Sequence, residues 1–135
     1  MKDLTLLIVT VALVSCGAKS SDEQRVRDVV AAMETAAESR DASDVLEHVA
    51  QNYEDAQGFD RAQLTNFLRG YFLAHPRIEL LVVFESLYFP ADGLAHAIIS
   101  VANLAPGDAD HERFKVEFRR EGDAWQLSRA DRLQP

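Results

Sequence analysis

The hydrophobic pattern of this chain changes type at Pro76. Before Pro76, apolar residues recur at the three- and four-residue spacing of amphipathic helices. After it, they form short runs rich in valine, isoleucine and phenylalanine, separated by turn sequences. Helices followed by strands in this order are typical of an α+β domain, whose helices pack on one face of an antiparallel sheet. The first prediction is therefore a single α+β domain.

Three helices are predicted before Pro76. The first is expected over residues 22–39, and the second ends near Ala50. The third begins after Asp60 and ends before Pro76, because a proline disfavours helical geometry in the residue that precedes it. Two capping boxes support the starts of the first and third helices, namely Ser21 with Gln24 and Asp60 with Gln63.

Four strands are predicted after Pro76. They are expected at about residues 78–89, 94–104, 111–120 and 124–133. The turns between them are too short for a crossover connection, so consecutive strands should be antiparallel neighbours in a meander. The sequence thus predicts three helices packed on a four-stranded antiparallel sheet.

The first predicted strand is apolar on both faces. Strict alternation places two sets of apolar residues on opposite faces. One face carries Ile78, Leu80, Val82 and Phe84, and the other carries Leu81, Val83, Leu87 and Phe89. Helices on one face alone would leave the second set exposed, and large apolar patches usually mark a partner surface. We therefore expect a homodimer formed through the back of the sheet, unless the chain's own loops cover a central strand.

The N-terminal segment has the layout of an export signal. Residues 4–15 are uncharged and mostly apolar, and as a helix they are too short to remain as a membrane span. Leu13, Val14, Ser15 and Cys16 resemble the bacterial lipobox, whose cysteine is acylated and becomes the first residue of the mature protein. An ordinary secretory leader with an incidental cysteine is the alternative.

The lipobox resemblance implies a location. Acyl chains on Cys16 would hold the protein in a membrane of the bacterial envelope. Gly17 stands where an aspartate would resemble an inner-membrane retention signal, so the periplasmic face of the outer membrane is expected rather than the inner membrane. The predicted organisation is a signal peptide over 1–15, the lipidated cysteine with a flexible tether over 16–23, and a folded domain over 24–135.

Charge and cysteine content disfavour several classes of protein. The chain has 14 basic and 22 acidic residues, and a net charge of −8 argues against nucleic acid as a partner. Its single cysteine cannot form an intramolecular disulfide. The four histidines match no zinc spacing, and Asp108, Asp110 and Glu112 lack the central glycine and distal glutamate of a calcium loop. No metal or other cofactor is expected.

Beyond the leader, the chain resembles the nuclear transport factor 2-like superfamily. This cone-shaped, cystatin-like α+β fold includes ketosteroid isomerase and the SnoaL-like cyclases. The resemblance rests on the order of the elements, on VAQNYED after the second helix, and on the final strand GDAWQLSRAD. It implies a conical pocket between the helices and the concave face of a bent sheet, with one short additional strand in NYEDAQGFDRAQL. The fold supports enzymes, carriers and dimerisation modules, so it implies no single chemistry.

Two residues are candidate general bases in such a pocket. Asp55 lies near the position of the carboxylate base in isomerase-like members, and His96 is expected to point into the cone on the same strand face as Ile98. A turn carboxylate at Asp55, a rim aromatic at Tyr53 and a hydrogen-bonded histidine at the end of the sheet are the structural alternatives. The first helix supplies no tyrosine to stabilise an oxyanion, since its inward residues are Val29, Val30, Met33 and Ala37.

Arg129 and Asp131 are ambiguous. Strict alternation places them with Trp125 and Leu127 inside the cone, where they would have to pair with each other or with a ligand. A bulge would turn them to solvent instead. The predicted pocket residues are Met33, Tyr53, Asp55, Tyr71, His96, Trp125, Arg129 and Asp131.

The sequence favours a membrane-anchored envelope lipoprotein with a non-catalytic domain. That domain would bind a small apolar ligand or a partner protein. The alternative is a small isomerase or cyclase that uses Asp55 or His96 as its general base.

Overall fold

A computed structural model describes residues 18–107 and 110–134. The predicted leader, Cys16 and Asp108 lie outside the described residues. No helix within the described part of the chain is both long enough and apolar enough to cross a membrane.

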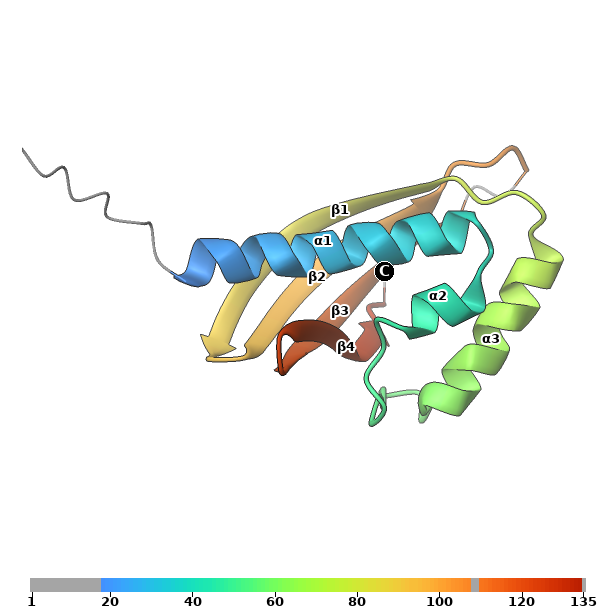
Figure 1. Cartoon of the computed structure of the whole chain (residues 1–135). Helices are drawn as coiled ribbons and strands as arrows, with labels where there is room; N and C mark the ends of the chain where they lie inside the picture. Colours follow the sequence, from blue (N-terminus) through green and yellow to red (C-terminus); the bar gives the residue numbers. More distant parts are fainter. Residues whose placement is uncertain (1–17, 108–109, 135) are drawn as a thin grey trace, which may run out of the picture.

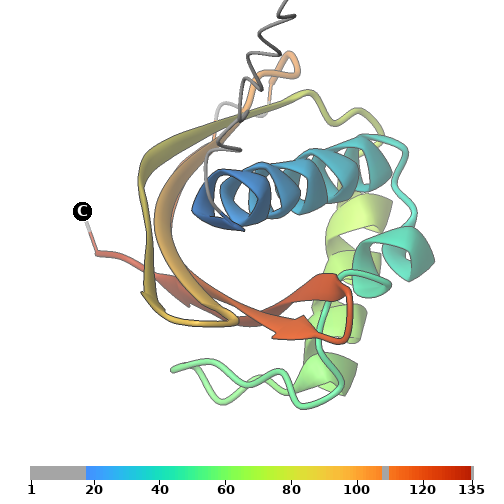
Figure 2. The ribbon, with the colours of Figure 1, turned by 60° about the vertical axis from the view of Figure 1, so that its left-hand side comes forward.

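The described residues form three helices followed by four strands (Figure 1). The helices are α1 (Ala18–Glu38), α2 (Ala42–Leu46) and α3 (Arg61–Ala74), and the strands are β1 (Leu80–Ala91), β2 (Leu94–Asn103), β3 (Asp110–Glu121) and β4 (Ala124–Arg132). The strands form one antiparallel sheet in the order β1-β2-β3-β4. Figure 2 shows this sheet curling around α1, with α2 and α3 on the open side. The α+β class and the meander are confirmed.

The beginning of α1 differs from the prediction. Ala18 is already helical, so Ser21 and Gln24 lie within the helix and do not form its cap. The Gln24 side chain instead donates a hydrogen bond to Asp28 at 2.8 Å, one turn further along. The segment from Ala18 contains no glycine or proline before Glu38, so no residue interrupts the helix. Residues 18–23, expected as a flexible tether, are helical.

The second helix is shorter than predicted, because the chain after it pairs with β4. α2 ends at Leu46, and Val49 forms a parallel bridge with Leu127. The Ala50 N–H donates to the Leu127 carbonyl at 2.9 Å. In place of the predicted short strand, this segment has only isolated bridges. Besides the Val49 bridge, one joins Glu54 to Asp60. This segment covers the edge of β4 and brings residues 53–59 to the sheet.

The predicted capping box of α3 is confirmed. The Asp60 carboxylate accepts from the Gln63 N–H at 2.9 Å, and the Gln63 side chain accepts from the Asp60 N–H at 2.9 Å. At the other end, His75 has extended backbone before Pro76, as expected. Arg40 donates to the carbonyl oxygen of Phe72 at 3.2 Å and so ties the end of α1 to the last turn of α3.

A bulge in β1 changes which residues face the core. The register between β1 and β2 shifts between Phe84 and Ser86, and a bulge of this kind reverses the facing of the residues beyond it. Leu87 and Phe89, predicted for the back of the sheet, therefore pack against the core with Phe84. The back face of β1 keeps Leu81, Val83 and Tyr88, which are 50%, 47% and 53% exposed. These three side chains form the β1 patch.

Candidate functional site

A cavity lies between the helices and the concave side of the sheet. Its volume is about 510 Å³, and we call it the central cavity. A second cavity of about 270 Å³, the side cavity, shares Phe67, Leu68 and Phe114 with it. The central walls are mainly aliphatic and aromatic, and include Val30, Met33, Val49, Phe59, Leu64, Val82, Ile99, Val116, Phe118 and Leu127. The cavity is thus lined by the apolar stripes of α1 and α3 and by the inward-facing residues of β1 to β4.

Few polar side chains interrupt the apolar wall of the central cavity. They are Glu34, Tyr53, Asp55, Gln57 and Arg132. Apolar walls with a small number of placed polar groups are typical of pockets for small molecules. The cavity can therefore exclude water from an apolar ligand while orienting it through one or two polar contacts.

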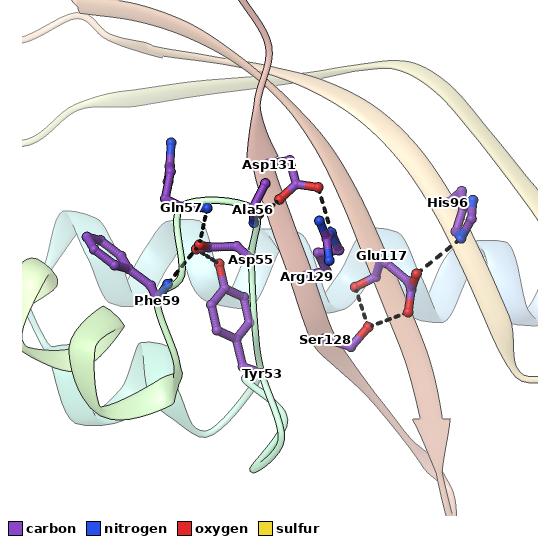
Figure 3. Close-up of polar contacts among 10 residues, drawn as sticks. All are labelled: Tyr53, Asp55, Ala56, Gln57, Phe59, His96, Glu117, Ser128, Arg129 and Asp131. Carbon is purple, nitrogen blue, oxygen red and sulfur yellow. Dashed lines mark hydrogen bonds and ion pairs between the residues drawn. The ribbon is translucent and has the colours of Figure 1, made fainter.

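Tyr53 and Asp55 form a buried hydrogen-bonded pair (Figure 3). The Tyr53 hydroxyl donates to Asp55 Oδ2 at 2.7 Å, and the two residues are only 3% and 6% exposed. The other carboxylate oxygen, Oδ1, accepts from the backbone N–H groups of Gln57 at 3.0 Å and Phe59 at 3.1 Å. Burial, together with the hydrogen bond to Asp55, raises the pKa of Tyr53, so its hydroxyl stays a neutral donor.

These contacts give Asp55 a structural role at the cavity wall. Its carboxylate accepts three hydrogen bonds that hold the turn through residues 55–59 in place. Three of the about four acceptor positions of the carboxylate are thus occupied by groups of the protein itself, and one position on Oδ2 is left. The arrangement is that of a turn carboxylate.

His96 lies on the back of the sheet, outside both cavities, so its predicted position in the cone is wrong. It does share a face with Ile98, but the inward residues of β2 are Ala95 and Ala97, which are fully buried, and Ile99. Alanine is much less hydrophobic than isoleucine. The alternation pattern therefore placed the face with His96 and Ile98 toward the core, although the face with Ala95 and Ala97 is the buried one.

On the back face, His96 joins a chain of polar contacts, of which Figure 3 shows those among His96, Glu117 and Ser128. Its Nε2 is 3.3 Å from Glu117 Oε2, and its Nδ1 is 3.3 Å from the Tyr88 hydroxyl. The Ser128 hydroxyl donates to Glu117 Oε1 at 3.1 Å. Burial opposes ionisation of Glu117, but hydrogen bonds from Ser128 and Arg119 outweigh it and lower the pKa of Glu117.

A bulge in β4 turns Arg129 and Asp131 away from the cavity. Phe118 pairs with Leu127 but Glu117 pairs with Arg129, so Ser128 is the additional residue. Of the two arrangements considered from the sequence, the structure has the bulged one. On the outer side, Arg129 Nε lies 2.6 Å from Asp131 Oδ2.

Asp131 also holds the loop after α2. Its Oδ1 accepts from the Ala56 N–H at 2.8 Å. Burial raises the pKa of Asp131, but the hydrogen bonds from Ala56 and Arg129 outweigh burial, and the net shift is downward. The Arg129–Asp131 pair therefore positions the 53–59 segment from outside and does not enter the cavity.

The other predicted pocket residues lie in three different places. Met33 lines the central cavity and Tyr71 lines the side cavity, where its hydroxyl accepts from Asn103 Nδ2 at 3.4 Å. Trp125 lines neither cavity; it packs in the core at a ring-centroid distance of 5.8 Å from Phe89. Met33, Tyr53, Asp55 and Tyr71 are thus brought to cavity walls, whereas His96, Trp125, Arg129 and Asp131 are not.

Sequence reasoning missed two charged residues of the central cavity, Glu34 and Arg132. Glu34 follows Val30 by four positions and precedes Ala37 by three, so helical spacing places it on the apolar stripe of α1. That spacing was available as a signal. Arg132 was not detectable in this way, because the Ser128 bulge alone turns it inward.

No three His, Cys, Asp or Glu side chains gather as metal ligands within residues 18–107 and 110–134. Asp110 and Glu112 lie at the side cavity, and Glu112 Oε2 is 3.1 Å from Arg132 Nε.

No protein-family model matches the chain, and no curated protein matches it. Solved structures do. An NTF2-like protein of unknown function from Pseudomonas putida is 19% identical, with a TM-score of 0.69, and the match covers 88% of this chain and 90% of that one. A domain of unknown function with a cystatin-like fold from Nostoc punctiforme is 13% identical, with a TM-score of 0.71, covering 86% and 78%.

A third similar structure carries the name of an enzyme. A protein from Novosphingobium aromaticivorans, provisionally named a scytalone dehydratase, is 8% identical, with a TM-score of 0.70, and the match covers 84% of each chain. At these identities the likeness concerns the fold alone. The described residues have the NTF2-like, cystatin-like α+β fold.

Proposed function

We propose that this NTF2-like domain is a non-catalytic binding module for a small apolar ligand. The observation that carries the proposal is the central cavity of about 510 Å³, whose walls are apolar except for a few placed polar groups. Burial of an apolar ligand there would contribute roughly 25 cal/mol for each Å² removed from water. A domain with such a cavity can retain or carry an apolar molecule without any reactive group.

The positions of the two candidate bases disfavour the alternative, an isomerase or cyclase. His96 is on the back face and cannot contact a ligand in the cavity. Asp55 is at the wall but is committed to three hydrogen bonds. The enzyme hypothesis therefore rests on Asp55 alone, and on the provisional name of one structure that shares only the fold.

Native mass spectrometry of the purified protein tests ligand binding. We expect a co-purified apolar ligand or, after addition of 1-pyrenemethanol, a one-to-one complex. Ala37 lines both cavities, so Ala37→Phe should fill the space and weaken 1-pyrenemethanol binding by at least about tenfold. Ala31→Phe, at an exposed site on the same helix, should leave it unchanged. Equal binding by the two variants, or no binding by the unmodified protein, would contradict the proposal.

We further propose that the binding domain is anchored to the periplasmic face of the outer membrane through acylated Cys16. The support is the lipobox-like stretch from Leu13 to Cys16, together with Gly17 after it. Cys16→Ser should move the full-length protein from the membrane fraction to the soluble fraction, because a myristoyl-length chain alone gives marginal binding and loss of all acyl chains gives none. Continued sedimentation of the Cys16→Ser protein with membranes would overturn this proposal.

The β1 patch supports a homodimer formed through the back of the sheet. Leu81, Val83 and Tyr88 are about half exposed on the described surface, and Ile98 of β2 lies on the same side. Analytical ultracentrifugation at micromolar concentration should give twice the monomer mass, and Leu81→Lys with Val83→Lys should give the monomer mass. A monomer before substitution would refute the dimer and leave the cavity proposal intact.

A further inference from the structure

The Glu34 carboxyl group lies in the apolar wall of the central cavity without a bonding partner among the described residues. It lies on the face of α1 that carries Val30 and Ala37, and it lines the central cavity with them. Its side chain has no hydrogen bond or ion pair with any residue of the described ranges 18–107 and 110–134. A carboxylate in such surroundings is destabilised by loss of hydration and gains most from a cationic or hydrogen-bond-donating partner.

The other charged groups of the cavity are already paired. Asp55 accepts three hydrogen bonds, and Arg132 is held 3.1 Å from Glu112. Glu38, one turn along α1, adds a like charge and accepts from the Leu80 N–H at 3.2 Å. The remaining titratable residues of the two cavities are Tyr53, Tyr71 and Asp110, none of which is cationic.

The balance of charge around the two cavities is negative. Glu34, Asp55, Asp110 and Glu112 outnumber Arg132. The whole chain also has a net charge of −8. An anionic ligand would therefore meet repulsion in the cavity, whereas a cationic group on an apolar ligand would be attracted.

We propose that the central cavity selects apolar amines, and that the Glu34 carboxylate binds the ammonium group of the ligand. This inference rests on the proposed binding function and adds the chemical class of the ligand. The apolar body of the amine would occupy the space between Met33, Phe118 and Leu127, and the ammonium group would lie against α1. Glu34 is partly buried, and an ion pair at a partly buried site is stronger than one in bulk solvent, which favours an amine over an alcohol.

The state of Glu34 adds a pH dependence. Burial, followed by the charge of Glu38, raises the pKa of Glu34 in the unliganded protein. The amine binds the carboxylate form, so its affinity should fall as the pH drops through this raised pKa. The affinity of a neutral ligand of the same shape should not follow that change. Asp55, Asp110 and Glu112 also face the cavities, so the dependence is assigned to Glu34 only if it disappears in Glu34→Gln.

Fluorescence titrations with three probes of one shape test this inference. The probes are 1-pyrenemethylamine, 1-pyrenemethanol and 1-pyrenecarboxylate, added to the unmodified protein, to Glu34→Gln and to Glu54→Gln. Glu54 is exposed and lines neither cavity, so its variant carries the same charge change as a matched control. We expect the amine to bind at least about tenfold more tightly than the alcohol, and the acid to bind most weakly.

The variants separate the outcomes. Glu34→Gln should abolish the preference for the amine and the loss of amine affinity at low pH. Binding of the alcohol should stay within about twofold, which corresponds to about 0.4 kcal/mol. Glu54→Gln should retain both the preference and the pH dependence. Equal binding of amine and alcohol, preference for the acid, or equal effects of the two variants would overturn the amine assignment while leaving apolar binding in place. Failure of all three probes to bind would overturn the amine assignment and the proposed function together.

Discussion

Replacing Phe118 with alanine is expected to lower the free energy of unfolding by about 3–5 kcal/mol. Phe118 is only 1% exposed and is among the largest fully buried side chains described. It lies on the inward face of β3, between Ala95 of β2 and Leu127 of β4. Its removal takes an aromatic ring from the core and enlarges the central cavity, which Phe118 lines. The loss is a large fraction of the total stability of a small domain, about 5–15 kcal/mol.

Urea denaturation followed by circular dichroism measures this loss, and Phe67 supplies the matched control. Phe67 also lines the central cavity but is 49% exposed on α3. Phe67→Ala should therefore cost about 1 kcal/mol, because less apolar area returns to water. If the two substitutions had equal effects, Phe118 would not occupy the core position described.

Replacing Asp55 with alanine is expected to cost about 2–4 kcal/mol, the second-largest loss. The substitution leaves the buried Tyr53 hydroxyl and the N–H groups of Gln57 and Phe59 without their acceptor. Asp55→Asn should cost less, since its carbonyl oxygen can still accept from both N–H groups and its amide can donate to Tyr53. The same denaturation experiment gives both values.

The neighbouring exposed residue Glu54 is the control for Asp55. Its side chain makes no hydrogen bond with the described residues, so Glu54→Ala should change stability by less than about 0.5 kcal/mol. A similar small change for Asp55→Ala would show that its three hydrogen bonds do not stabilise the fold. Loss of a catalytic activity in Asp55→Asn with stability unchanged would instead favour the enzyme alternative.

Local signals in the sequence predicted much of the fold. The Asp60 and Gln63 capping box and Pro76 mark the ends of α3 within a few residues, because both act through adjacent backbone groups. The hairpin turns were predicted from their glycines, and Gly93 and Gly122 have φ of +72° and +61°, which glycine adopts readily.

The facing of the strand residues could not be predicted in the same way. Bulges near Phe84 and at Ser128 each reverse the alternation beyond them, and nothing in the local sequence distinguishes a bulge from regular pairing. Leu87 therefore packs against the core and not on the back face. Arg129 faces away from the central cavity, and Arg132 lines it. The bulge in β4 and the weak hydrophobic signal of Ala95 and Ala97 in β2 made the pocket residues on strands harder to predict than those on α1 and the loop after α2.

The most direct test of the central claim is to locate a bound apolar probe by NMR. Intermolecular NOEs would be measured between 1-pyrenemethanol and the methyl-labelled protein. The proposed function predicts NOEs to Val30, Val116 and Leu127, whose side chains line the central cavity. NOEs to Leu81 and Val83 instead would place the probe on the back of the sheet and contradict a binding function for the cavity.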